Sequence, residues 1–342
     1  MPRRVGPRLE GFRPRPRAWT GRGYRIERAG ALCYDLAPRF MNERRSGQVH
    51  AKISRIHHPG TAGELLALLG KGRGRVAPVG GGVSFSFSVP PKVTELASIR
   101  ALGLDYVRLD ARGLHLGAAA TLGRLASSPC AMKFMGGLFA SAAGRVAAIT
   151  NRNMITVGGN AVRLFIWSDL PVVYCAAGAR FVLRGARGTR RLSAEQFYKS
   201  LPASWLRGAE FLREIVIPPA APRAGAAYEK FCETENTFAL VSAAACVELG
   251  RGGVCASARL ALGGLQLPPR VSQRAAEALE GGTPSAERIR EAAAAAVEEV
   301  KAVRDIRAGS EYKKRLAAVV ARRALEKAFA AAGAPQAGGA RS

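Results

Sequence analysis

Two glycine-rich segments, widely separated in the chain, constrain its fold more than any other feature of the sequence. The first is Val79-Gly80-Gly81-Gly82-Val83-Ser84 and the second is Thr156-Val157-Gly158-Gly159-Asn160. Each follows an apolar stretch, residues 75–79 or Ile155 with Val157, whose pattern predicts a short strand. Glycine permits positive φ and a close approach of the backbone to a ligand. Successive backbone N–H groups in such a loop can form a nest for phosphate. The pair predicts a diphosphate held from two sides.

Neither segment matches the two best-known nucleotide-binding motifs. There is no GxGxxG opening a helix with an acidic residue about twenty positions on, and no Gly-Lys-Ser/Thr follows either glycine cluster. A plain turn therefore stays open as an interpretation of each segment alone. Thr156 and Asn160 bracket the second glycine pair with side chains that can hydrogen-bond a ligand. Asp169, a little further on, could accept hydrogen bonds from a ribose or a flavin ring.

At these residues the sequence resembles the FAD-binding (medium) subunits of the molybdenum hydroxylases, the family of xanthine dehydrogenase and carbon monoxide dehydrogenase. The resemblance extends over roughly residues 51 to 330. It rests on the glycine segments together with Arg152-Asn153, Ser168-Asp169-Leu170-Pro171, Tyr228-Glu229-Lys230-Phe231, Phe238-Ala239-Leu240-Val241-Ser242 and Asp305-Ile306-Arg307-Ala308 with Tyr312.

The resemblance implies an FAD site on this chain, with no catalytic side chain and no metal ligand of its own. Backbone N–H groups of Gly158 and Gly159 would donate to the diphosphate, and Lys230 would place positive charge near the flavin. For Lys230 a surface position, and for Leu212 a place in the core, are the alternatives. The implied cofactor-binding residues are Pro78, Val79, Gly80, Gly81, Gly82, Val83, Ser84, Thr156, Val157, Gly158, Gly159, Asn160, Asp169, Leu212 and Lys230.

Two departures from the family pattern concern this site. Val83 stands where the family prefers threonine, and the loss of one charge-assisted bond to phosphate would cost about 1.5–3 kcal/mol. Arg163-Leu164-Phe165-Ile166 replaces the small residues that usually separate the Asn160 and Asp169 positions. The first favours weaker FAD retention, and the second favours a change in flavin shielding or in the electron acceptor. Together they keep open an alternative function as a flavin-free assembly or interaction subunit.

The fold that the resemblance implies is α+β. A two-lobed FAD-binding domain of the PCMH type would span residues 51–226, with lobes at about 51–116 and 117–226. A C-terminal α+β domain at 227–332 would carry a small antiparallel sheet followed by helices. The Arg- and Pro-rich residues 1–50 predict a disordered basic N-terminal extension, and residues 333–342 a flexible tail.

Charge and cysteine content limit the alternatives. A net charge of +27 is typical of proteins that bind polyanions, yet no helix-turn-helix, RRM or KH signature is present. We therefore expect no nucleic acid, and keep a polyanion-binding protein as a further alternative. The six cysteines form no CxxC pair, which disfavours an iron–sulfur or zinc site and indicates reduced thiols in a cytoplasmic protein. No apolar run is long enough to span a membrane.

The resemblance also implies partners. A large subunit would carry the molybdopterin and a small subunit two [2Fe–2S] clusters, assembled as a dimer of heterotrimers. Electrons would reach the FAD from the clusters and leave it for NAD⁺, a quinone or oxygen. The absence of cysteine clusters in this chain fits that division of labour.

Overall fold

The computed structural model describes residues 52–206, 209–235 and 237–333. The predicted N-terminal extension lies outside the described residues, as does nearly all of the predicted C-terminal tail. In the described part, no helix is both long and apolar enough to cross a membrane.

A small parallel sheet begins the described chain. Its strands are β1 (Arg55–His57), β3 (Glu95–Ser98) and β2 (Val76–Val79), hydrogen-bonded in that order. Helix α3 (Ala62–Gly72) connects β1 to β2 and places Leu65 and Leu69 in the core. Thr61 directly precedes a helical pattern of apolar residues, which predicts an N-cap, and its hydroxyl accepts a hydrogen bond from the Glu64 N–H at the start of α3.

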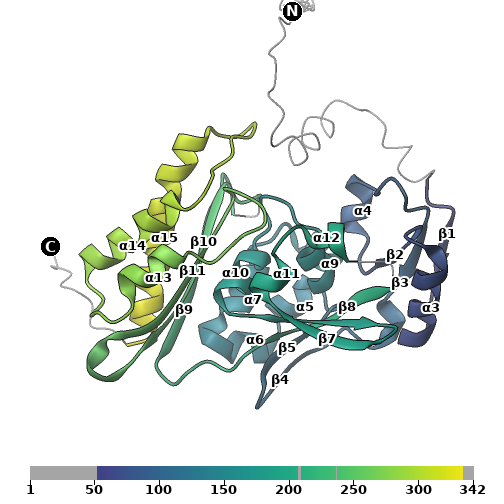
Figure 1. Ribbon diagram of the computed structural model, residues 1–342, viewed down its shortest axis with the longest axis horizontal. Coiled ribbons are helices and arrows are strands. Elements are labelled where there is room, and N and C mark those ends of the chain that lie inside the picture. Colours follow the sequence, from purple (N-terminus) through teal and green to yellow (C-terminus); the bar gives the residue numbers. More distant parts are fainter. Residues whose placement is uncertain (1–51, 207–208, 236, 334–342) are drawn as a thin grey trace, which may run out of the picture. The chain divides into compact units, whose positions relative to one another are not determined.

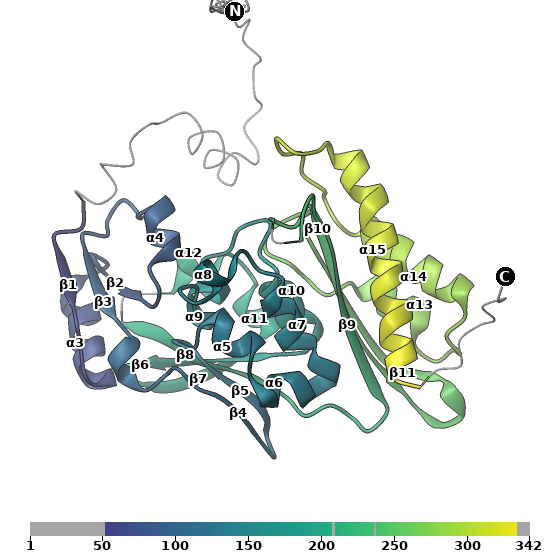
Figure 2. The same cartoon turned by 180° about the vertical axis from the view of Figure 1, so that it is seen from behind.

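An antiparallel sheet of five strands follows. Its order is β4 (Val107–Asp110), β5 (Gly113–Gly117), β8 (Glu210–Ile217), β6 (Arg180–Gly185) and β7 (Gly188–Ser193). The sequence predicts a hairpin of residues 106–109 and 114–117 around Arg112-Gly113, and β4 and β5 form it. The pairing of β5 with β8 joins segments far apart in sequence (Figure 2). The sheet of the second lobe therefore begins at Val107, before the lobe boundary at 116–117 that we expected.

Short helices fill the chain between β5 and β6. Residues 131–148 are small and apolar and predict a helical stretch, but the structure interrupts it, because Met135, Gly136 and Gly137 adopt positive φ. Helix α9 contacts β5 and β8, whereas α7 and α10 also contact the C-terminal sheet (Figure 1). The helices from β5 to β8 are α5 (Leu122–Ala126), α6 (Pro129–Lys133), α7 (Leu138–Gly144), α8 (Ile149–Arg152), α9 (Val157–Val162), α10 (Leu170–Ala176), α11 (Ala194–Phe197) and α12 (Pro202–Trp205).

The last part of the chain is an antiparallel sheet covered by helices. Its order is β11 (Cys255–Gly263), β10 (Val241–Leu249) and β9 (Ala224–Phe231). Helices α13 (Gln273–Leu279), α14 (Ala286–Glu298) and α15 (Ser310–Ala331) lie along one face (Figure 1). The sequence predicts strands at 227–232, 238–248 and 254–263 and helices at 271–280, 285–303 and 310–332, and the structure forms each with ends that differ by a few residues.

The central strand β10 is buried on both faces, and this joins the two halves of the chain. Side chains of a strand alternate between its faces. Ala244 accordingly packs into the core of the FAD-binding part, together with Tyr228 of β9 and Ala261 of β11. Ala243 and Ala245 pack beneath the C-terminal helices in a second core. The C-terminal sheet is thus shared between both cores.

Candidate functional site

The first glycine segment turns directly from a strand into a helix. Pro78 and Val79 end β2, and helix α4 (Val83–Phe87) begins immediately after Gly82. Gly82 has φ 78°, a left-handed conformation that glycine adopts without strain. The backbone N–H groups of residues 80–84 donate to no acceptor in the described part of the chain. A left-handed residue followed by right-handed ones forms the concave row of N–H groups that binds anions.

The second glycine segment differs from its prediction. We expected a strand ending at a glycine pair with positive φ, but Thr156 is the N-cap of helix α9 and neither Gly158 nor Gly159 has positive φ. The Thr156 hydroxyl accepts a hydrogen bond from the Gly159 N–H at 3.1 Å. The alternation of Ile155 and Val157 predicted a strand, but Thr156, three residues before Gly159, starts a helix by capping it.

The N–H groups of this second segment already have acceptors within the protein. Val157 donates to the carbonyl oxygen of Ala120 at 2.8 Å, and Gly158 donates to that of Ala118 at 2.9 Å. A Cβ on Gly158 would lie 2.8 Å from the Ala118 side chain, so this glycine permits close packing of α9 on the segment after β5. The proposed donation from Gly158 and Gly159 to a diphosphate is therefore not how this backbone is arranged.

The two glycine segments nevertheless meet. A Cβ on Gly80 would lie 2.5 Å from the Thr156 hydroxyl oxygen, and one on Gly81 would overlap the Met154 carbonyl oxygen. Helices α4 and α9 thus both begin at the contact between the segments. The contact that the sequence predicts is confirmed. At this contact, the backbone N–H groups that lack an acceptor in the described part of the chain belong to the first segment.

Two polar side chains lie close to this contact, and among the described residues one lacks a hydrogen-bond donor and the other lacks a carboxylate partner. The side-chain oxygen Oδ1 of Asn160 is buried and accepts no hydrogen bond from the described residues. Arg163 ends α9, donates to the Ser88 carbonyl oxygen at 3.1 Å and lies over the Phe85 ring at 5.6 Å. No carboxylate in the described part pairs with it, and burial lowers the pKa of its guanidinium. A row of N–H donors, an orphaned amide oxygen and a desolvated cation fit a dinucleotide with an anionic centre.

Asp169 and Lys230 form a buried ion pair. The side chains are only 5% and 1% exposed, and Nζ of Lys230 lies 3.4 Å from Oδ2 of Asp169. Tyr228 donates its hydroxyl hydrogen to Oδ1 of the same carboxylate. Burial raises the pKa of the Asp169 carboxyl, against the charge of Lys230 and the hydrogen bond from Tyr228. Lys230 is therefore not a surface lysine.

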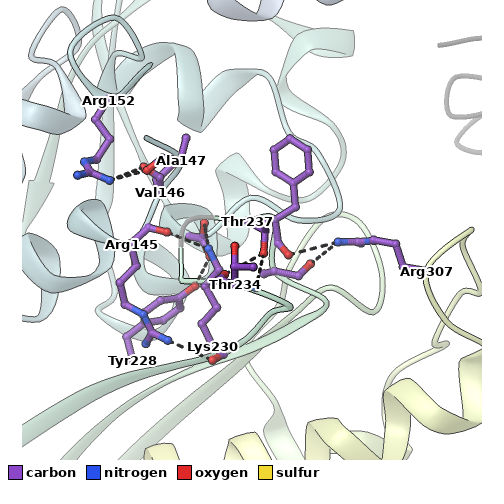
Figure 3. A network of polar contacts seen from close by, with 12 residues as sticks. Arg145, Val146, Ala147, Arg152, Tyr228, Lys230, Thr234, Thr237 and Arg307 are labelled. Atoms are coloured by element: carbon purple, nitrogen blue, oxygen red, sulfur yellow. Dashed lines mark hydrogen bonds and ion pairs between the residues drawn. The ribbon is translucent and has the colours of Figure 1, made fainter. Parts of the chain in front are cut away.

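Arg145, which follows α7, ties this ion pair to the FAD-binding part of the chain (Figure 3). Its guanidinium donates to the Lys230 carbonyl oxygen at 3.1 Å, and its own carbonyl oxygen accepts from Lys230 Nζ at 2.9 Å. The guanidinium also lies 5.7 Å from the centre of the Tyr228 ring. Sequence reasoning missed Arg145 as well as the part that Tyr228 plays. The role of Tyr228 was predictable, because Tyr228 and Lys230 are two residues apart on one strand and therefore lie on the same face.

The bulky segment between Asn160 and Asp169 forms an aromatic stack. Trp167 lies between Phe165 and Phe238, with ring centres 5.3 Å and 4.7 Å away. The guanidinium of Arg307 lies 5.8 Å from the Trp167 ring and donates to the Ala239 carbonyl oxygen at 3.0 Å. Leu212, by contrast, is 5% exposed on β8 and belongs to the hydrophobic core, the alternative considered for it from the sequence.

The structure thus combines an N-terminal part that presents a row of unpaired N–H donors, a C-terminal sheet covered by helices, and a buried ion pair between the two. The family described as "FAD binding domain in molybdopterin dehydrogenase" matches residues 51–220. That described as "CO dehydrogenase flavoprotein C-terminal domain" matches residues 226–328. The chain belongs to the FAD-binding medium subunits of the molybdenum hydroxylase family.

Individual relatives extend over most of the chain. The carbon monoxide dehydrogenase medium chain of Afipia carboxidovorans is 28% identical over 81% of this chain and 96% of its own length. Subunit alpha of the 6-hydroxypseudooxynicotine dehydrogenase complex of Paenarthrobacter nicotinovorans is 27% identical over 77% of this chain and 90% of its own length.

Solved structures give the same picture. The reconstituted CO dehydrogenase from Oligotropha carboxidovorans superposes with a TM-score of 0.75 at 27% identity, over 81% of this chain and 98% of that one. Quinoline 2-oxidoreductase from Pseudomonas putida 86 gives 0.74 at 26% identity, over 82% and 98%. The recognition, the α+β fold and FAD as the cofactor, all expected from the sequence, are confirmed.

Proposed function

We propose that this chain carries FAD between a molybdopterin-containing large subunit and an iron–sulfur small subunit of a cytoplasmic hydroxylase. Bound FAD would supply the redox chemistry, taking electrons from the partner's [2Fe–2S] clusters and giving them to NAD⁺, a quinone or oxygen. The described cysteines, Cys130, Cys175, Cys232, Cys246 and Cys255, are all free, as expected where thiols stay reduced. We propose a dimer of heterotrimers as the assembly.

The observation that carries the FAD site is the contact of Gly80 with Thr156. It sets the unpaired N–H groups of residues 80–84 beside α9. In the proposed site, Pro78, Val79 and Gly80 through Ser84 hold the diphosphate. Thr156, Val157, Gly158 and Gly159 then shape the opposite wall by their close packing.

Polar groups around the opposite wall orient the rest of the cofactor. Asn160 offers its orphaned oxygen to a donor on the ligand, and Arg163 offers positive charge. Asp169 and Lys230 contribute one buried ion pair. Leu212 acts through the packing of β8 beneath the site.

The direct test of the FAD site is the flavin content of the purified chain. We expect a yellow protein that releases about one FAD per chain on denaturation. Asn160→Ala should bind FAD more weakly, because it removes an acceptor from the site. Asn151→Ala, on the exposed side of α8, is the matched control and should keep wild-type affinity. A colourless wild-type chain that cannot be loaded would leave the assembly role as the remaining function.

The partner proposal has a separate test. Affinity purification of the tagged chain from its native cells should recover two further polypeptides in equal amounts. Elemental analysis should find molybdenum with the larger one and iron with the smaller one. Recovery of the chain alone under gentle conditions, with its FAD bound, would contradict the partners and leave the flavin site intact.

A further inference from the structure

Tyr228 stands out because its hydroxyl is buried, is bonded to a carboxylate and has no part in the FAD contacts proposed above. Its side chain lies on the face of β9 that packs into the core of the FAD-binding part. Burial raises the pKa of Tyr228, so the hydroxyl keeps its proton and can donate it to an acceptor. Its acceptor is Oδ1 of Asp169.

The hydrogen bonds around Asp169 favour its ionised form, whereas burial opposes it. The Lys230 ammonium has three N–H groups, of which one donates to Asp169 and one to the Arg145 carbonyl oxygen. Asp169 therefore has two donors, one from Lys230 and one from Tyr228, for a charge that is almost completely removed from water. The remaining charged group that faces it is Arg145, over the Tyr228 ring. An ionised carboxylate in such surroundings persists only while it is hydrogen-bonded and paired.

We propose that Tyr228 is a positioning residue for the flavin: its hydroxyl keeps Asp169 ionised, so that the Asp169–Lys230 pair presents no net charge to the cofactor. This inference rests on the FAD site proposed above. Without the hydroxyl, Asp169 loses one of its two hydrogen bonds and burial favours its neutral form further, so the negative charge beside Lys230 is lost. The site then carries one unbalanced positive charge, which stabilises the reduced, anionic flavin relative to the oxidised form.

The test is Tyr228→Phe in the full-length chain loaded with FAD, with the flavin midpoint potential measured by reductive titration. We expect the variant to keep its FAD and to have a more positive potential than the wild type at about pH 6. The difference should shrink as the pH rises, because ionisation of Asp169 in the variant restores the balance of charge. A loss of packing alone would not produce this pH dependence.

Tyr174→Phe is the matched control. Tyr174 lies on α10, is also fully buried, and its hydroxyl has no hydrogen-bond partner among the described residues. Removal of that hydroxyl should leave the flavin potential at the wild-type value across the same pH range. A shift as large as that of Tyr228→Phe would overturn the inference, since it would show a general effect of losing a buried hydroxyl.

Asp169→Asn keeps the inference testable if Tyr228→Phe does not fold. The amide fixes the neutral state, so the potential should be raised at every pH in the range. Wild-type potentials in either variant, with FAD still bound, would overturn the role of Tyr228 and leave the FAD site standing. A wild-type chain that binds no FAD would remove both the inference and the proposed function.

Discussion

At the scale of single residues, Gly81 has the least room of any position in the two glycine segments. A side chain there would overlap the Met154 carbonyl oxygen, a backbone atom just before the second segment. Gly80 faces the Thr156 side chain, whose hydroxyl is held by its hydrogen bond from the Gly159 N–H, so a Cβ there would contact a side chain and not a backbone. The absence of a Cβ at Gly81 is thus required by contact between two backbones.

Gly81→Ala should destabilise the protein and lower its FAD content. Forcing one methyl group into a filled space costs about 1–3 kcal/mol. Urea unfolding and the ratio of FAD to protein would measure the two effects. Gly70→Ala is the matched control, because Gly70 lies in α3 with nothing within 4 Å of a built Cβ. We expect the control to be neutral or more stable by up to about 1 kcal/mol. Equal stability and flavin content in both variants would contradict a steric requirement for glycine at position 81.

The two glycine segments also show which features of the site can be predicted from the sequence. Their contact was predictable, because both the residue types and the family resemblance pointed to one ligand. Which N–H groups stay unpaired was not predictable. The carbonyl oxygens of Ala120 and Ala118, in the segment after β5, accept the N–H groups of Val157 and Gly158 only once β5 and α9 are packed. Asp169 and Lys230 were found as separate candidates, but their pairing across two domains was not.

At the scale of elements, helices α4 and α9 are tied at two points. Their first residues meet where the glycine segments touch, and Arg163 at the end of α9 bonds to Ser88, the residue that ends α4. The guanidinium also stacks on Phe85 of α4. Neither helix has more than six residues, so packing against each other, rather than helix propensity, holds them.

Arg163→Ala should weaken FAD binding about tenfold, which corresponds to about 1.4 kcal/mol. The variant loses the bond to Ser88 and the contact with the Phe85 ring, which together fix α4 and the anion cup that precedes it. Titration of the apoprotein with FAD, followed by flavin fluorescence, would measure the change. Arg180→Ala, an exposed arginine on β6, controls for loss of one positive charge. Equal affinities in the two variants would mean that Arg163 does not hold the cup.

At the scale of the whole molecule, the segment between α14 and α15 depends on one carboxylate. Asp305 accepts hydrogen bonds from Arg307 and from Lys313, each at 2.8 Å. Lys313 has no exposed surface and also donates to the Gly264 carbonyl oxygen. Burial acts to raise the pKa of Asp305, but the hydrogen bonds outweigh it and lower that pKa to about 2. A carboxyl whose folded pKa is depressed stabilises the fold above its ordinary pKa.

The free energy of unfolding should therefore contain an Asp305 contribution that is complete at neutral pH. It declines as the pH falls below the ordinary value of 3.8 and towards about 2. Asp305→Asn should cost about 2 kcal/mol near pH 7, because it leaves the Lys313 ammonium buried without its counter-ion. Urea unfolding at several pH values should show the deficit narrowing in acid. Asp305→Asn combined with Lys313→Met should recover part of the loss. If the loss of unfolding free energy in Asp305→Asn did not depend on pH, it would not come from the charge of the Asp305 carboxylate.

The sequence by itself determined the α+β class, the glycine segments and most strands and helices, because alternation, caps and hairpin turns are local signals. It predicted a helical stretch through 131–148, where Met135 and two glycines break the path, and a strand at the second glycine segment, where a threonine cap starts a helix. Tertiary structure alone decided which donors remain unpaired and which charges are paired. The Asp169–Lys230 pair and its Tyr228 donor arise because β10 is buried on both sides, which brings a strand of the C-terminal sheet against the FAD-binding core.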